Sequence, residues 1–75
     1  MKLNPNTNIP RFLQAVQGCK GDVHYLTLEG DDLNLKSALA QFLFAAVVAG
    51  QLKELPGEIR FQDHEDVSVL QRYLL

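Results

Sequence analysis

The chain has 75 residues, a net charge of −2 and 47% hydrophobic residues. This size predicts a single domain over residues 1–75, and the hydrophobic content is typical of folded rather than disordered chains. The seven basic residues are scattered along the chain, which argues against the basic surface that nucleic-acid binding needs. We therefore expect proteins, not nucleic acids, as partners.

Cysteine usage and hydropathy indicate the compartment. Cys19 is the single cysteine, so the chain forms no internal disulfide and suits a reducing environment. The start of the chain is polar and rich in Asn, and we expect no secretory signal there. The apolar run over residues 38–49 is shorter than the roughly 20 residues that span a bilayer. These features predict a cytoplasmic protein that makes no membrane contact.

A loop and a helix are expected first. Residues 4–8 read Asn-Pro-Asn-Thr-Asn and predict a loop, because Asn and Thr side chains bond their own backbone. Asn8 is a suitable N-cap for a helix from about Ile9 to Gln17, and proline is tolerated in its first turn. Residues 1–3 are a candidate for a short leading strand.

A hairpin follows. Residues 22–28 are rich in β-branched and aromatic residues, which is typical of a strand. Residues 29–32 predict the turn, and residues 33–35 predict a short second strand with apolar residues two apart.

The second helix is predicted from about Ala38 to Leu52. Ser37 directly precedes it and can cap it, since a serine oxygen accepts a free backbone N–H of the first turn. The helix is apolar on most sides, and a domain of 75 residues cannot easily bury such a helix all round. We expect a surface for a partner or for self-association on this helix.

The C-terminal third contains a strand and a last helix. Residues 55–57 break the chain, and residues 58–62 alternate polar and apolar side chains, as a strand with one wet face does. Asp63 is expected to cap the last helix, with Glu65 and Asp66 in its first turn.

These elements predict an α+β fold. Its antiparallel sheet of three or four strands carries three helices on one face. The apolar residues that we expect in the core are Phe12, Val16, Leu39, Leu43, Ile59, Phe61, Leu70 and Leu74.

The order of elements, with Asn34-Leu35-Lys36-Ser37 at the second helix, resembles HPr, the histidine-containing phosphocarrier of the bacterial sugar phosphotransferase system. Asp22-Val23 at the first strand and Gly57-Glu58-Ile59 at the last strand agree with this resemblance, which runs from Ile9 to Leu75. It implies an open-faced β-sandwich and a role linked to sugar transport.

The phosphoacceptor histidine of that family is missing. In the family it stands at the start of the first helix, followed by an arginine and a proline. The corresponding loop contains no histidine, and its residues are Pro5, Asn6, Thr7, Asn8, Pro10 and Arg11. Neither proline nor asparagine replaces imidazole as a nucleophile. The resemblance therefore implies a regulatory or binding module without catalytic residues, cofactor or metal.

A second site of the family matches Ser37. In many Gram-positive bacteria a regulatory kinase phosphorylates this serine, and a phosphate suits the positive end of a helix dipole. The family also docks partners beside it. The nearest equivalents of those docking residues are Ala38, Leu39, Gln41, Phe42 and Ala45. The implied partners are phosphotransferase-system components or the kinase.

Each candidate has a plainer interpretation. Ser37 can be a helix cap alone, and Cys19 a packing residue. His64 beside two aspartates is more typical of a solvated helix start than of a metal site, and His24 of a surface strand position. Two alternatives stay open for the whole chain. One is a phosphocarrier with an unrecognised acceptor, and the other is a self-associating module unrelated to sugar transport.

Overall fold

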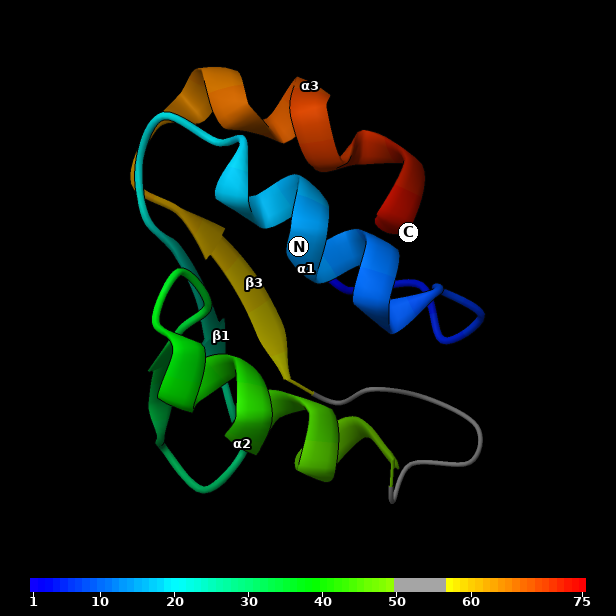
Figure 1. Ribbon diagram of the computed structural model, residues 1–75, viewed down its shortest axis with the longest axis vertical. Coiled ribbons are helices and arrows are strands. Elements are labelled where there is room, and N and C mark those ends of the chain that lie inside the picture. Colours follow the sequence, from blue (N-terminus) through cyan, green and yellow to red (C-terminus); the bar gives the residue numbers. More distant parts are fainter. Residues whose placement is uncertain (50–56) are drawn as a thin grey trace.

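The computed structural model describes residues 1–49 and 57–75 of the chain (Figure 1). Its regular elements are α1 (Ile9–Gln17), β1 (Val23–Leu26), β2 (Asp32–Asn34), α2 (Ala38–Ala49), β3 (Glu58–Phe61) and α3 (Val67–Leu70). Two 3-10 turns, His64–Asp66 and Gln71–Tyr73, flank α3. These described residues form an α+β fold with three α-helices, as predicted.

The three strands form an antiparallel sheet in the order β2-β1-β3. The predicted leading strand is reduced to single backbone contacts, of Met1 with β3 and of residues 2–4 with the C-terminal residues 73–75. Met1 accepts the backbone N–H of Ile59 at 2.6 Å, and its ammonium donates to the Ile59 carbonyl at 3.2 Å. Leu3 forms an isolated bridge with Leu74. Met1 therefore lies at the free edge of β3, but no fourth strand forms within the described residues.

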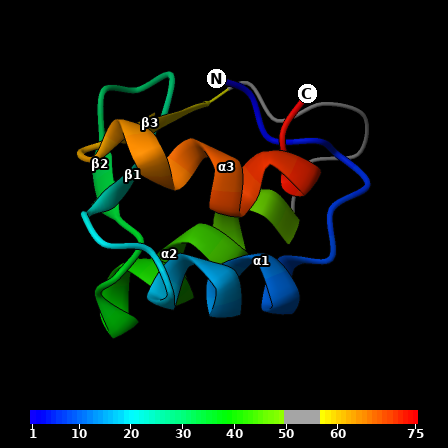
Figure 2. The same ribbon diagram turned by 90° about the horizontal axis from the view of Figure 1, so that it is seen from above.

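Helices cover one face of the sheet. Val23 and Tyr25 of β1 and Ile59 of β3 are buried, whereas His24 and Arg60 project from the opposite face toward solvent. Figures 1 and 2 show α1, α2 and α3 on the same side of the strands. This confirms the expected layer arrangement and places the core between the sheet and the helices.

The helix α1 has the predicted bounds and the predicted cap. The Asn8 side-chain oxygen accepts the backbone N–H of Arg11 at 3.1 Å. Phe12 and Val16 are fully buried, and the Phe12 ring packs against the rings of Phe44 and Tyr73.

The buried face of α2 differs from the prediction. Leu39 and Leu43, expected in the core, are 69% and 44% exposed. Ala40 and Phe44 face the sheet in their place, and the Phe44 ring lies 4.9 Å from the Tyr25 ring, edge to face. The helix is apolar on most sides, so its periodicity does not mark one side as the buried one. The predicted end of this helix, residues 50–52, lies outside the described residues.

The other predicted core residues lie inside. Phe12, Val16, Ile59 and Leu70 are buried, and Phe61 and Leu74 are partly buried against them.

The start of the last helix also differs from the prediction. Asp63 accepts the backbone N–H of Glu65 at 2.9 Å, but it caps a 3-10 turn, and α3 itself is only four residues long. Asp66, expected in a solvated first turn, is buried. Its carboxylate accepts the backbone N–H groups of Gly21 at 2.8 Å and Lys20 at 2.9 Å. These hydrogen bonds lower the pKa of Asp66 and fix the loop after α1 to the start of α3.

Candidate functional site

Ser37 occupies the predicted cap position at the start of α2. The backbone of residues 34–37 forms a tight turn, in which Asn34 accepts the N–H of Lys36 on its side chain and the N–H of Ser37 on its carbonyl. The Ser37 hydroxyl oxygen lies 3.5 Å from the N–H of Ala40, which is a long hydrogen bond, and the residue is exposed. An exposed hydroxyl at this position is accessible to a modifying enzyme.

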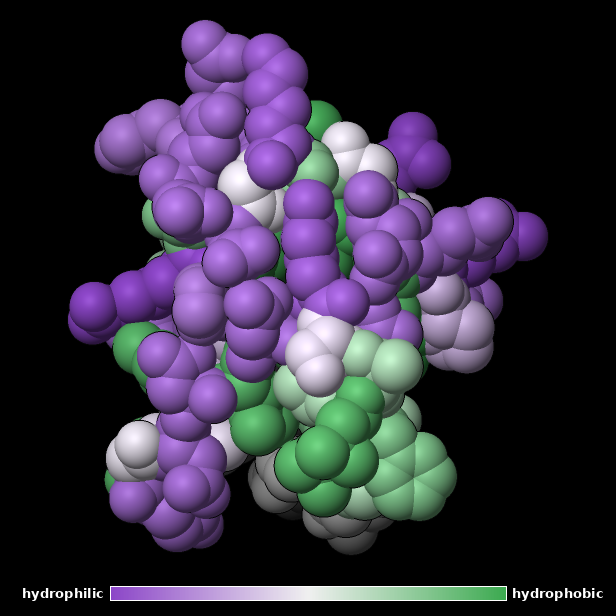
Figure 3. Space-filling view, turned by 60° about the vertical axis from the view of Figure 1, so that its left-hand side comes forward, coloured by the Kyte–Doolittle hydropathy of each residue, from purple (hydrophilic) through white to green (hydrophobic). Residues whose placement is uncertain are grey.

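The outer side of α2 carries an apolar surface. Leu39 and Phe42 are 69% and 72% exposed, Leu43 is 44% exposed, and Ala46 lies exposed beside them. We call these four residues the α2 patch. Figure 3 shows the hydrophobic side chains gathered over α2 at the bottom of the molecule, while hydrophilic residues cover most of the rest of this face. Contiguous exposed apolar side chains of this kind mark interaction sites.

The predicted partner-binding residues lie on or beside the α2 patch. Ala38, Leu39 and Phe42 are exposed, whereas Gln41 and Ala45 are half-buried. The Gln41 side-chain amide donates to the Leu35 carbonyl at 2.8 Å, which ties it to the preceding loop. Leu43 was missed as a surface residue because its apolar side chain predicted burial.

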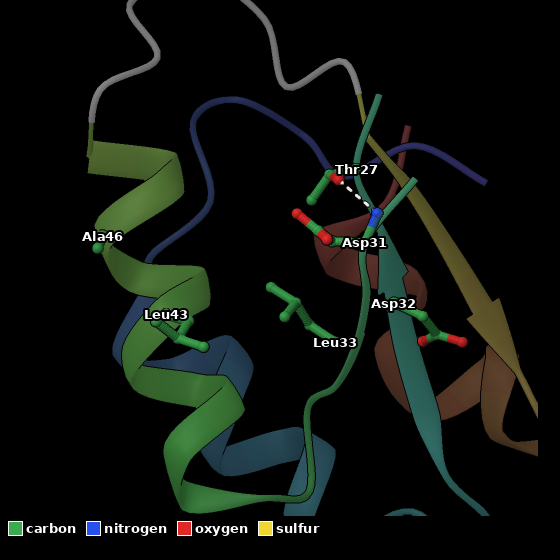
Figure 4. A pocket seen from close by; sticks show the side chains of 6 residues that line it. All are labelled: Thr27, Asp31, Asp32, Leu33, Leu43 and Ala46. Carbon is green, nitrogen blue, oxygen red and sulfur yellow. Dashed lines mark hydrogen bonds between the residues drawn. The ribbon is translucent and has the colours of Figure 1, made fainter. Parts of the chain in front are cut away.

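A groove lies between α2 and the turn that joins β1 to β2. Its volume is about 520 Å³, and it is lined by Thr27, Asp31, Asp32, Leu33, Leu43 and Ala46. Figure 4 shows Leu33 and Asp31 directed toward α2, whereas Asp32 points to the other side of its strand. The Asp32 carboxylate meets Nδ1 of His24 at 2.7 Å on the outer face of the sheet. This groove was not predicted from the sequence, because it depends on how α2 packs against the hairpin.

The loop that replaces the phosphoacceptor region serves the local structure. Asn4 accepts the N–H of Asn6 on its side chain, the Thr7 hydroxyl donates to the Tyr73 carbonyl at 3.1 Å, and Asn8 caps α1. The remaining residues of this region, Pro5, Pro10 and Arg11, are exposed. Neither histidine of the chain belongs to this loop, since His24 lies on β1 and His64 in the turn before α3.

Cys19 and the acidic residues form no reactive cluster in the described part of the chain. Burial raises the pKa of the Cys19 thiol, with a contribution from nearby Asp66, so the reactive thiolate is disfavoured. Among residues 1–49 and 57–75, no three His, Cys, Asp or Glu side chains come together as a metal site would require. In the same residues, no helix has the length and apolar character to cross a bilayer.

Comparison of the chain with protein-family models, with curated proteins and with solved structures gave no significant match. The α2 patch and the groove beside it are therefore the features on which a function can be argued.

Proposed function

We propose that the chain is a small protein-binding module that acts through the α2 patch. The observation that carries this proposal is the exposure of Leu39 and Phe42, two large apolar side chains less than one helical turn apart. Covering apolar surface releases roughly 25 cal/mol per Å², and aromatic residues at the centre of such a patch often dominate binding.

We further propose that this binding serves regulation in a sugar phosphotransferase system, as in an HPr-like protein that lacks the phosphoacceptor histidine. The order of elements supports this proposal, as does the position of Met1 beside β3, where a fourth strand of an open-faced β-sandwich would lie. The exposed Ser37 next to the α2 patch supports it as well.

Ser37 is proposed as the switch of this module. A phosphate adds about −1.5 to −2 charges at neutral pH. Residues 38–49 contain no charged residue, and Lys36 carries a single positive charge directly before Ser37, so the phosphate would make the charge at this end of α2 negative. A partner that covers Leu39 would then meet a strongly hydrated group at the edge of its contact.

The binding test uses HPr kinase and enzyme I as probes. For whichever of these two proteins binds the chain, we expect Phe42→Ser to weaken binding at least about tenfold, the loss typical of an interface anchor. The same variant should leave the unfolding midpoint unchanged. The matched control is Val69→Ser, whose side chain is 46% exposed and which belongs to α3, at the other end of the molecule from α2 (Figure 1). Equal weakening by both variants would remove the α2 patch from the proposal.

The switch test is direct. HPr kinase and ATP should add one phosphate to Ser37, detected by mass spectrometry and abolished by Ser37→Ala. No added phosphate, under conditions that modify a genuine HPr, would leave Ser37 as a helix cap. Acid-labile phosphate taken from phosphorylated enzyme I, and lost on changing His24 or His64, would favour a phosphocarrier instead.

A further inference from the structure

The groove beside α2 combines an apolar floor with an acidic wall. Leu33, Leu43 and Ala46 supply the apolar surface, and Leu43 and Ala46 belong to the α2 patch as well. The two surfaces are therefore continuous. A ligand that covers the α2 patch therefore contacts two residues of the groove lining, Leu43 and Ala46.

The acidic wall comes from the turn between β1 and β2. Residues 27–32 carry three carboxylates, on Glu29, Asp31 and Asp32, and no basic side chain. Asp32 is engaged by His24 on the far side of the strand. The Asp31 carboxylate makes no hydrogen bond or ion pair within the part of the chain that the structure describes, and it is directed toward α2 (Figure 4). An unpaired carboxylate beside an apolar floor is complementary to a cation on an apolar stem.

We propose that the groove receives a lysine or arginine side chain from an amphipathic segment of a partner protein, whose apolar side chains cover the α2 patch. This proposal rests on the binding function proposed for α2 and specifies the chemistry of the partner. The aliphatic stem of the basic residue lies on Leu33 and Leu43, and its charged end meets Asp31, as long cationic side chains commonly arrange themselves.

Charge argues against the other occupants of an apolar patch. An anionic membrane surface attracts basic proteins, and it would repel the three carboxylates of this turn. A symmetric pair of copies places the same patch against itself, so it would bring two acidic turns to one interface. A basic partner is the occupant that this surface complements.

The test uses two fluorescein-labelled helical peptides as probes, one of leucine and lysine and one of leucine and glutamate in the same pattern. Fluorescence polarisation should show binding of the lysine peptide only, weakening as salt shortens the screening length from about 10 Å at 0.1 M to about 3 Å at 1 M. Asp31→Asn should weaken this binding by about two- to fivefold, the range for one exposed charge pair. The hydrogen bonds between the Asp31 backbone and Thr27 do not involve the Asp31 carboxylate, so this substitution does not remove them.

The matched control is Glu65→Gln. It removes the same charge from the 3-10 turn before α3, at the opposite end of the molecule from α2 (Figure 1). Unchanged binding in this variant, together with weaker binding of Asp31→Asn, supports the proposal. Equal loss in both variants would reduce the effect to net charge and overturn it. Binding of the glutamate peptide or of anionic phosphatidylglycerol vesicles in place of the lysine peptide, or a dimer that occupies the patch, would also overturn it.

The two proposals fail differently. If Phe42→Ser abolishes partner binding while Asp31→Asn leaves it unchanged, the α2 patch stands as a binding surface and the basic-partner proposal falls. If Phe42→Ser leaves the binding of every partner and peptide unchanged, the binding function proposed for α2 is overturned, and the basic-partner proposal that rests on it is overturned as well.

Discussion

The helices α1 and α2 pack on the same sheet, but the surfaces that they expose to solvent differ in polarity. The exposed side of α1 is polar, with Arg11, Gln14 and Gln17. The exposed side of α2 is apolar, with Leu39 and Phe42. One buried apolar face is sufficient for a helix to pack, and α1 has no more than that. The additional apolar surface of α2 contributes little to folding, and it is the surface for which we propose a binding function.

The two phenylalanines of α2 allow the sharpest test of this contrast. Phe44 is fully buried against Phe12 and Tyr25, whereas Phe42 is 72% exposed. We expect Phe44→Ala to lower the free energy of unfolding by about 3–5 kcal/mol. Phe42→Ala should change it by less than about 0.5 kcal/mol. Urea unfolding followed by circular dichroism measures both values.

Phe44→Leu keeps most of the volume and should retain the fold with a smaller loss, which guards against a Phe44→Ala variant that does not fold. Similar losses for Phe42→Ala and Phe44→Ala would mean that both sides of α2 are packed, and the contrast with α1 would disappear.

Gly57 controls the position of the ring on which α2 rests. A Cβ at this position would overlap the Tyr25 ring and lie 2.7 Å from the Leu26 carbonyl oxygen. Gly57→Ala should therefore cost about 1–3 kcal/mol, the usual range for overpacking. Gly18→Ala at the end of α1 is the control, since its nearest neighbour would be an oxygen at 3.4 Å. Thermal unfolding of the two variants distinguishes them, and an equal shift would contradict the close contact at Tyr25.

Asp66 holds the loop after α1, so the anchoring of α1 depends on pH. Residues 38–49 of α2 contain no charged residue, so no side chain of this helix contributes such a dependence. The folded state lowers the pKa of Asp66, because Gly21 and Lys20 donate to its carboxylate. Its contribution to stability is therefore complete above the unfolded aspartate pKa of about 3.9 and is lost as the pH falls through the lower folded value.

Asp66→Asn should lower the unfolding midpoint at pH 7 and reduce the loss of stability on acidification below about pH 4. Glu65→Gln, which breaks only an exposed ion pair with Lys20, should leave both properties unchanged. Chemical denaturation at several pH values measures this difference. A variant curve parallel to wild type would mean that Asp66 does not carry the acid sensitivity.

The caps of the two helices should differ in strength. The Asn8 side-chain oxygen accepts the backbone N–H of Arg11 at 3.1 Å. The Ser37 hydroxyl oxygen accepts the backbone N–H of Ala40 at 3.5 Å. We expect Asn8→Ala to cost about 1 kcal/mol and Ser37→Ala about 0.5 kcal/mol. Ser37→Asp should retain the stability of the wild type, since a carboxylate also caps and suits the helix dipole. A larger loss at Ser37 than at Asn8, measured by urea unfolding, would contradict this order.

Local signals in the sequence were sufficient for α1 and β3. Asn8, Pro10 and Gly18 mark the ends of α1 within a few residues, and the alternation over residues 58–61 places Ile59 inside. Such signals act between neighbours along the chain. They can be recognised in the sequence because the turns and caps that they specify need no contact with a distant segment.

Other features depend on contacts between distant segments. The orientation of α2 could not be predicted, because the space between Phe12 and Tyr25 decides which of its apolar side chains is buried. The burial of Asp66 depends on backbone N–H groups 45 and 46 residues away, which carry no sequence signal. The groove depends on the hairpin and α2 meeting at Leu33 and Leu43. The sequence identified Leu39 and Phe42 as candidates, but not the acidic surface beside them.

Tyr25 gives this molecule a built-in optical probe. The chain has no tryptophan and two tyrosines, so its near-ultraviolet signal comes mainly from Tyr25 and Tyr73. Burial raises the pKa of the Tyr25 phenol, whose oxygen accepts the N–H of Gly57. The Phe44 ring lies against this phenol. Any event that pulls α2 from the sheet would release Tyr25 to ionise at lower pH, and phenolate absorbance would record the movement without an added label.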